Sequence, residues 1–198
     1  MTPPEHGTAR SAGLAVLLPV KAFHQAKLRL APALDDAARA ELARAMATTV
    51  AAAAGALPLF VVCDDPEVMS WASGVGAQVL WRPGLGLNGA VTHGVATLAA
   101  RGFGRVIVAH ADLPHALDLG AVAAAPGVTL GPDRRGDGTN VVCVPTDAGF
   151  RFAYGPGSFA RHRAEAARLG LALRILREPR LAWDVDLPDD LVVPSWLA

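Results

Sequence analysis

The sequence predicts an α/β protein built as a three-layer sandwich, with helices on both faces of a mostly parallel mixed sheet. Short apolar segments alternate with helical patterns from one end of the chain to the other. Several of these segments are apolar without polar alternation, as in strands that are buried on both faces. The 198 residues, 52% of them apolar, suffice for one domain with a full core. We expect residues 1–12 to be a disordered leader and residues 13–198 to form a single domain.

The first half of the chain contains four expected strands, at residues 14–19, 59–63, 78–81 and 105–110. A basic, irregular loop follows the first strand. The expected helices are an alanine-rich one at residues 36–54, a short one with Asp65 as N-cap and Pro66 at its first position, and one at residues 88–101.

The second half of the chain is less regular. A weak helix is expected at residues 117–125, followed by strands at residues 128–131 and 140–145. Ser158 is expected to cap a helix that ends at Gly170, where glycine fits a left-handed C-cap. Further strands are expected at residues 171–176 and 181–183.

Charge and cysteine content exclude several classes of function. Lysine plus arginine equals aspartate plus glutamate at 18 each, so there is no basic surface for nucleic acid or an anionic membrane. The apolar residues 12–20 are too few to span a bilayer, and no signal cleavage site follows them. Cys63 and Cys143 lie in strand segments and are expected to be small buried side chains. We therefore expect a cytoplasmic protein with a small-molecule partner.

Aspartates follow two of the apolar segments at the point where each segment ends. Asp112 precedes Pro114, and the pair Asp184 and Asp186 precedes Pro188; each proline stops the ladder of a strand. Ligands of open α/β sheets bind at the carboxyl ends of the strands. Side chains two residues apart on extended backbone face the same way, so both carboxylates of the pair reach one point. The pattern predicts a site for a hard cation such as Mg²⁺ together with a phosphate ligand.

Three cations lie in the loop after the first strand, namely Lys21, Lys27 and Arg29. Lysine offers a point charge and arginine a bidentate fork, so the loop predicts a cradle for polyphosphate. It is not a Walker A loop, because that motif is absent from the chain. The alternative is an ordinary solvated loop, and the acidic strand ends favour the phosphate site.

The segment from Gly84 to Gly89 matches G-x-G-x-x-G after a strand and before a helix. A dinucleotide site is therefore a competing interpretation. Against it, Pro83 separates the strand from the first glycine, and the motif lies on the third strand–helix unit rather than the first. We favour a close approach of glycine backbone to a nucleoside, with the Asn88 amide bonding base or ribose.

Glycines and hydroxyls combine in residues 137–140 and 154–159. Ser158 at a helix start, with free backbone amides behind it, predicts an anion site for a second phosphate or a carboxylate. His162 lies one turn further along and could join that site. The alternatives are an ordinary turn, an ordinary N-cap, and a histidine used for packing or left on the surface.

Together these segments resemble the phospholactate/phosphoenolpyruvate guanylyltransferases of deazaflavin coenzyme F-420 biosynthesis. The matching segments are residues 19–30, 86–88, 112–114, 138–140, 155–158 and 184–188, in the order of the family. The resemblance implies a nucleotide-diphospho-sugar-transferase-like fold. It also implies GTP as donor, a divalent metal (Mg²⁺, or Mn²⁺), and a three-carbon phosphoacid as acceptor.

The resemblance also implies roles for particular residues. The metal ligands implied are Asp112, Asp184 and Asp186. The contacts to the acceptor implied are Thr139, Gly155 and Ser158. The chain departs from the family at Leu28, where a serine or threonine is usual, so a hydroxyl contact is missing from the phosphate-binding loop.

The expected reaction is attack of the acceptor's phosphate on the α-phosphorus of GTP, with release of pyrophosphate. A phosphate monoester is largely ionised near neutral pH, so no general base is needed. The alanine- and arginine-rich composition is typical of high-GC genomes, such as those of actinobacteria, and for these the family resemblance implies phosphoenolpyruvate as the favoured acceptor. 2-Phospho-L-lactate and 3-phosphoglycerate remain alternatives, since pocket shape decides between them. A homodimer and a downstream transferase that takes the product are further expectations. The alternative from another class is a dinucleotide-binding module.

Overall fold

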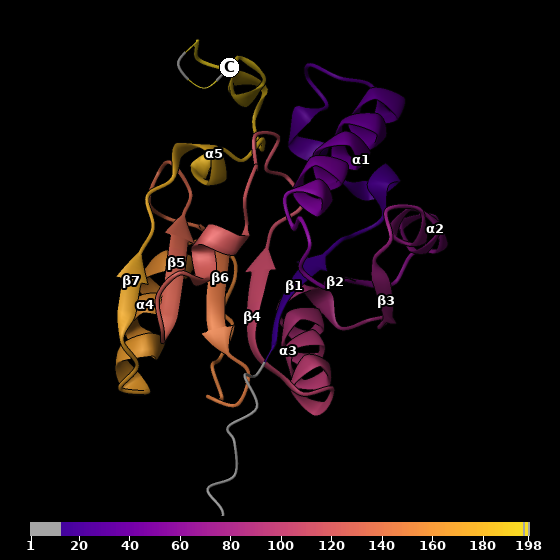
Figure 1. Ribbon diagram of the computed structural model, residues 1–198. Helices are drawn as coiled ribbons and strands as arrows, with labels where there is room; N and C mark the ends of the chain where they lie inside the picture. Colours follow the sequence, from indigo (N-terminus) through magenta and orange to yellow (C-terminus); the bar gives the residue numbers. More distant parts are fainter. Residues whose placement is uncertain (1–12, 196, 198) are drawn as a thin grey trace, which may run out of the picture.

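Seven strands form one mixed sheet through the middle of the molecule (Figure 1). The computed structural model describes residues 13–195 and 197, and the leader expected at residues 1–12 lies outside them. The strand order is β3-β2-β1-β4-β6-β5-β7. The strands are β1 (Gly13–Pro19), β2 (Leu59–Cys63), β3 (Gln78–Trp81), β4 (Phe103–Ala109), β5 (Val128–Pro132), β6 (Thr139–Pro145) and β7 (Leu173–Ile175).

Strand β6 is antiparallel to both of its neighbours, β4 and β5, and the other strand pairs are parallel. The mixed, mostly parallel sheet expected from the sequence is therefore confirmed. Because β6 runs the other way, its first residue Thr139 lies beside the carboxyl end of β4. The amide of His110, just after β4, donates to the carbonyl of Asn140 at 2.9 Å. The reversal thus brings the start of β6 to the end of the sheet where ligands bind.

Helices cover both faces of the sheet, as a three-layer sandwich requires (Figure 1). Alternate side chains of β1 enter separate cores, with Val16 and Leu18 in one and Ala15 and Leu17 in the other. The first core includes residues of α1 and α2, and the second includes residues of α3 and α4. These helices are α1 (Asp36–Ala52), α2 (Pro66–Gly74), α3 (Gly86–Ala100) and α4 (Ser158–Arg168).

Two expected elements are wrong. Residues 181–183 do not form a strand, because Leu181 and Ala182 belong to α5 (Pro179–Ala182). This helix has a proline at its first position, and the side chain of its N-cap Glu178 accepts from the amide of Arg180. The helix expected at residues 117–125 is only a 3₁₀ turn, Gly120–Ala123. Its alanines have helix propensity, but glycine opens the segment and a proline follows it.

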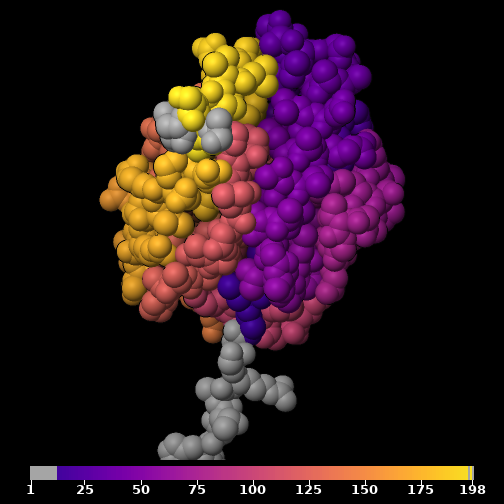
Figure 2. All heavy atoms as spheres, turned by 45° about the horizontal axis from the view of Figure 1, so that its top comes forward, coloured from indigo at the N-terminus to yellow at the C-terminus, as the bar shows by residue number. Residues whose placement is uncertain are grey.

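Segments from the two halves of the chain meet above the sheet. The amide of Val185 donates to the carbonyl of Asp112 at 3.3 Å, which joins the two aspartate segments directly. A small core of Leu30, Met46 and Trp183 fixes the segment after α5 against α1. Figure 2 shows the N-terminal half, indigo to magenta, side by side with the orange and yellow C-terminal half. None of the helices within residues 13–195 combines the length and hydropathy needed to span a bilayer.

Candidate active site

The three predicted metal-binding aspartates lie together at the carboxyl end of the sheet, with a lysine among them. Lys27 Nζ is 2.6 Å from Asp112 Oδ2 and 2.9 Å from Asp186 Oδ1. Asp184 is 7% exposed and lines a cavity together with Asp112 and Asp186. The site is next to the crevice between β1 and β4, where the strand order reverses direction along the sheet.

Lys27 is held in an unusual backbone conformation. Its φ is +57°, and among the described residues it is the only non-glycine with positive φ. It connects two 3₁₀ turns, Phe23–Gln25 and Leu28–Leu30, whose Phe23 and Leu30 side chains are buried. A left-handed residue other than glycine is costly, so the buried anchors on both sides hold the loop in place. The loop thereby presents Lys27 to the carboxylates.

The carboxylates are not equally neutralised. Burial alone would raise the pKa of Asp112, but the adjacent Lys27 ammonium holds it below its usual value. Asp184 has no cation that close, since its nearest, Arg134 Nη1, lies 3.8 Å from Asp184 Oδ1. Burial first, and then the negative charges of Asp112 and Asp186, raise its pKa. Lys27 therefore contacts two of the three carboxylates and leaves Asp184 without a close cation, so the cluster favours a further positive charge.

Two buried oxygens identify where that charge fits. Asp112 Oδ1 and Asp184 Oδ1 are buried and have no hydrogen-bond partner. Carboxylate oxygens are the ligands that Mg²⁺ prefers, so the donor set fits a divalent cation. With Lys27 in place, the described part of the chain contains no group of three acidic, histidine or cysteine side chains already arranged around a metal position.

Asp190 holds the Asp184–Asp186 segment in shape and was not predicted from the sequence. Its buried carboxylate accepts from the amides of Asp186 and Leu187, each at 2.8 Å, and from Arg134 and Arg135. Burial would raise the pKa of Asp190, but the two amides and the Arg134 guanidinium hold it below its usual value.

Arg134 extends this support to the backbone of the first aspartate of the pair. Its Nη1 donates to the carbonyl of Asp184 at 3.0 Å. The guanidinium also stacks over Trp183, 4.2 Å from the ring centroid. The local sequence signal for Asp190 was weak, because an acidic residue shortly after a proline normally indicates an exposed turn.

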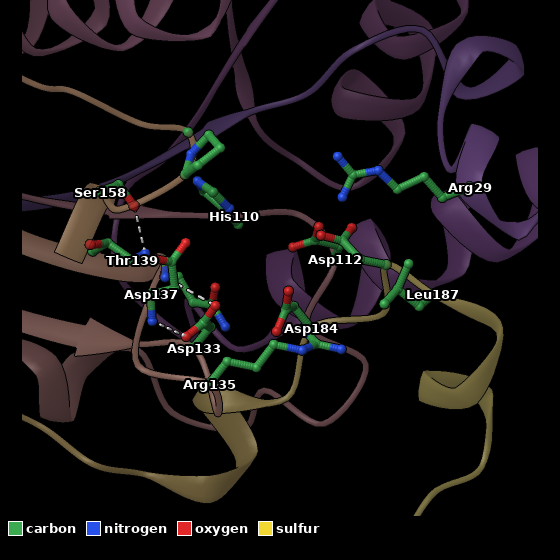
Figure 3. Close-up of a pocket in the computed structure, with 15 residues that line it drawn as sticks. Arg29, His110, Asp112, Asp133, Arg135, Asp137, Thr139, Ser158, Asp184 and Leu187 are labelled. Carbon is green, nitrogen blue, oxygen red and sulfur yellow. Dashed lines mark hydrogen bonds between the residues drawn. The ribbon is translucent and has the colours of Figure 1, made fainter.

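A polar cavity of about 390 Å³ opens beside the carboxylates (Figure 3). The size is typical of small-molecule sites. Figure 3 shows Asp112 and Asp184 between Arg29 on one side and Thr139 with Ser158 on the other. Other lining residues include His110, Asp133, Arg135, Asp137 and Gly155. The structure therefore places the predicted acceptor residues and the predicted metal ligands around one cavity.

The predicted anion site at the start of α4 differs from the expectation. Gly157, with φ +71°, is the N-cap, and Ser158 is the first helical residue. The amides of Gly157 and Phe159 donate to the side chain and carbonyl of Asp137, and that of Ser158 donates to Gly155. Those three amides are therefore occupied. What faces the cavity at this point is the hydroxyl group of Ser158.

Asn88 lies in the first turn of α3 and binds the loop before α4. Its Oδ1 accepts from the amide of Tyr154 at 2.7 Å, and its Nδ2 donates to the Tyr154 carbonyl at 3.4 Å. Gly155 follows directly, with a φ of +112° that favours glycine. Asn88 thus positions the wall of the cavity that contains Gly155. Its contact with a nucleoside stays a prediction.

A second cavity, of about 330 Å³, lies on the other side of Lys27. Its lining includes Lys21, Lys27, Phe23, Met46 and Leu87, and it shares His110, Asp112, Gly155 and Asp186 with the first cavity. The three predicted phosphate-binding cations are therefore separated. Lys21 faces the second cavity, Arg29 faces the first, and Lys27 lies between them.

The glycine-rich segment does not lie where a dinucleotide site would be. Gly84 follows β3, which is an edge strand, whereas the sheet changes direction between β1 and β4. Gly86 and Leu87 instead line a small cavity with Lys21, Asp64 and Arg82 at the ends of β1, β2 and β3. This position is next to the second cavity, because Lys21 and Leu87 line both cavities, and the close approach of glycine backbone to a ligand stays a prediction.

Comparison with known proteins agrees with this arrangement. The family model described as "Guanylyl transferase CofC like" matches residues 14–193. The chain belongs to this family. A phosphoenolpyruvate guanylyltransferase of Sphaerobacter thermophilus is 39% identical over 184 residues, which cover 88% of this chain and 89% of the relative. One of Thermomonospora curvata is 40% identical over 186 residues, covering 89% and 80%. The chain is therefore a guanylyl transferase family member over nearly its whole length.

Solved structures place this guanylyl transferase among nucleotidyltransferase folds. A putative nucleotide-diphospho-sugar transferase of Desulfovibrio desulfuricans has a TM-score of 0.73 at 18% identity, covering 90% of this chain and 84% of that one. A 4-diphosphocytidyl-2C-methyl-D-erythritol synthase has a TM-score of 0.61 at 11% identity, covering 90% and 94%. At these identities the likeness concerns the fold, and it confirms the fold class expected from the sequence.

Proposed function

We propose that this guanylyl transferase moves GMP from GTP to phosphoenolpyruvate and releases pyrophosphate. The observation that carries the proposal is the position of Asp112 and Asp186, which line both cavities and meet at Lys27. Two ligands that occupy the two cavities would meet at these carboxylates, as a donor and an acceptor must. The names of the relatives support the choice of both substrates.

In the proposed reaction an oxygen of the acceptor phosphate attacks the α-phosphorus of GTP. A bond forms between that oxygen and the α-phosphorus, and the bond from the α-phosphorus to the β-bridging oxygen breaks. Pyrophosphate leaves with the electron pair. The attacking monoester is already ionised, so the site needs no general base, and catalysis consists of positioning and charge neutralisation.

The side chains divide this work between the two substrates. Lys21 and Lys27 lie at the second cavity and bind the triphosphate as point charges. Thr139, Ser158 and Arg29 surround the first cavity and bind the phosphoacid. A fork such as that of Arg29 suits a carboxylate or phosphate, so we assign it to the acceptor rather than to the triphosphate.

A divalent cation completes the proposed site. Asp112, Asp184 and Asp186 would hold Mg²⁺, or Mn²⁺ in its place, and such an ion supplies charge neutralisation for the phosphates. Five carboxylates line the first cavity against the guanidinium groups of Arg29 and Arg135. Binding of an anionic acceptor there is therefore favoured by additional positive charge.

The product of this reaction would be enolpyruvyl-diphospho-guanosine. We assign it to coenzyme F-420 biosynthesis, with a downstream transferase as its consumer, on the strength of the family resemblance. A homodimer is part of the same proposal, and size-exclusion chromatography with light scattering would test it. A monomer at micromolar concentration would contradict the dimer without affecting the proposed reaction.

A pyrophosphate-release assay tests the proposed function. It crosses GTP, ATP and CTP with phosphoenolpyruvate, 2-phospho-L-lactate and 3-phosphoglycerate in the presence of Mg²⁺. We expect the highest kcat/KM for GTP with phosphoenolpyruvate. A higher value with 2-phospho-L-lactate would keep the reaction and change the acceptor. No pyrophosphate with any pair, from protein shown to be folded by circular dichroism, would overturn the proposal.

A further inference from the structure

His162 is a buried histidine that connects two walls of the first cavity, the one proposed to bind the acceptor. It lies in the second turn of α4 and is 0% exposed. Its Nε2 accepts from the amide of Ala153 at 2.9 Å, two residues before Gly155. Its Nδ1 lies 3.0 Å from Thr139 Oγ1 at the start of β6. One side chain thus touches both the loop and the strand that line the cavity.

The partners of the ring determine where its proton lies. A backbone amide can only donate, so Nε2 must present a lone pair to Ala153. A neutral imidazole then carries its hydrogen on Nδ1, which donates to Thr139 Oγ1. Burial and the nearby Arg161 lower the pKa of His162 to about 4, which is consistent with a neutral ring.

This arrangement sets the direction of two hydroxyl groups. Thr139 Oγ1 accepts from His162, so its own proton is left to donate elsewhere. Ser158 Oγ accepts from the amide of Thr139 at 3.0 Å, and its proton is likewise left to donate (Figure 3). Both residues line the first cavity. The protein thus donates a hydrogen bond to the oxygen of each hydroxyl. Each hydroxyl can then donate its own proton to an oxyanion in the cavity.

We propose that His162 is a positioning residue for the acceptor phosphoacid, because it orients the Thr139 hydroxyl as a donor and holds the Gly155 loop against it. The inference rests on the proposed function, since it concerns the acceptor half of the same site. His162 touches neither substrate in this arrangement. It acts on the acceptor through Thr139 and through the backbone at Ala153.

A purely structural role for His162 makes a different prediction. The ring packs among aromatic side chains, with centroids 5.0 Å from Tyr154, 5.7 Å from Phe150 and 6.4 Å from Phe152. A phenylalanine would supply this packing but neither hydrogen bond. A glutamine side chain has an NH₂ group that donates and a carbonyl oxygen that accepts, so it can supply both hydrogen bonds without an aromatic ring. The two substitutions therefore separate packing from positioning.

Steady-state kinetics of His162→Phe and His162→Gln tests the proposal. We expect His162→Phe to raise KM for phosphoenolpyruvate about tenfold, the loss expected for one hydrogen bond to a charged group, with KM for GTP unchanged. We expect His162→Gln to stay within about threefold of the wild type. Val144→Ala, a core change at the far end of β6, is the control for lost stability and should leave both KM values unchanged. The proposal would be overturned if the Phe and Gln variants changed KM for phosphoenolpyruvate equally, or if either variant changed KM equally for phosphoenolpyruvate and GTP.

A double-mutant cycle with Thr139→Val tests the coupling itself. If His162 acts through the threonine hydroxyl, His162→Phe adds little once that hydroxyl is gone. Full additivity of the two changes in acceptor KM would contradict this pathway. If His162→Phe proves unstable, His162→Leu takes its place in the cycle, because leucine also lacks both hydrogen-bonding groups.

Nitrogen NMR of the histidine rings gives a readout that does not depend on catalysis. We expect His162 in the full-length wild type to carry its hydrogen on Nδ1 at neutral pH. A hydrogen on Nε2 would overturn the inference whatever the kinetics show. If the Nδ1–H form is found but no acceptor supports turnover, the proposed function fails while the assigned hydrogen-bond direction stands.

Discussion

Lys27 Nζ lies 2.6 Å from Asp112 Oδ2, in an ion pair between residues 85 positions apart in the chain. The lysine side chain is 10% exposed and the aspartate side chain 22%. Because the same ammonium contacts Asp186, it occupies the space between two carboxylates predicted to bind a cation. The pair therefore joins the loop after β1, which is predicted to bind phosphate, to the acidic end of β4.

Replacing Asp112 tests the acidic cluster. We expect Asp112→Asn to lower kcat on the order of 10³-fold, because one of the charges that organise the site is lost. The fold should remain, since asparagine has the same shape. Pyrophosphate release at saturating Mg²⁺ measures the effect, and Asp118→Asn, at an exposed turn, is the matched control. Turnover near the wild-type rate would refute the assignment of Asp112 as a metal ligand.

Asp190 should matter for metal dependence although it does not line either main cavity. We expect Asp190→Asn to raise the Mg²⁺ concentration for half-maximal rate by about 10–100-fold, the usual cost of removing a residue that orients a ligand. The buried carboxylate also neutralises Arg134 and Arg135, so its loss should lower the free energy of unfolding by about 3 kcal/mol.

Its neighbour provides the control for this experiment. Asp189 is exposed, and Asp189→Asn should change neither the Mg²⁺ dependence nor the urea midpoint. If both variants show the same Mg²⁺ dependence as the wild type, the support of Asp186 and Leu187 by Asp190 has no role in metal binding.

Arg29 and Lys21 should affect different substrates, because they face different cavities. We expect Arg29→Gln to raise KM for phosphoenolpyruvate about 10–100-fold, the cost of a charge-assisted bond, with a smaller effect on GTP. Lys21→Gln should show the reverse preference. Initial rates with each substrate varied in turn provide the measurement. If both variants raise KM for GTP to the same extent, Arg29 is to be assigned to the triphosphate instead of the acceptor.

The sequence was sufficient to predict the convergence of the three aspartates. Asp112 and the pair at Asp184 and Asp186 each stand where an apolar segment ends, and a general rule of parallel sheets brings such points together. The rule gave the right place even though residues 181–183 are not a strand. Helix α5 was missed because three apolar residues fit either element. The proline at its first turn was the signal that could have identified it.

Contacts between distant side chains could not be predicted in the same way. Asp190 bonds Arg134, 56 positions away, and His162 bonds Thr139, 23 positions away. Neither pair has a local pattern, since an aspartate in an acidic turn and a histidine on a helix normally face solvent. Their roles depend on which loops meet, and that is decided by packing of the whole chain.

The neutral state of His162 makes a prediction about stability and pH. Its pKa is lowered from 6.5 to about 4 in the folded protein, chiefly by burial. Between those values the unfolded chain binds a proton that the folded chain does not, so the free energy of unfolding falls as the pH is lowered. Above pH 6.5 both states are neutral and this contribution is constant. The full shift corresponds to about 3 kcal/mol.

Other groups also titrate in this range, so the experiment compares two proteins. Urea unfolding of the wild type and of His162→Gln, at several pH values from 7 down to about 4, gives the difference in the free energy of unfolding between the two proteins at each pH. We expect the wild type to lose up to about 3 kcal/mol more than His162→Gln, because glutamine cannot take up the proton. Asp112 is present in both proteins, so its contribution cancels. Parallel curves across the whole range would show that the ring is protonated as readily in the folded protein as in the unfolded one, and that would remove the neutral imidazole on which the orientation of Thr139 depends.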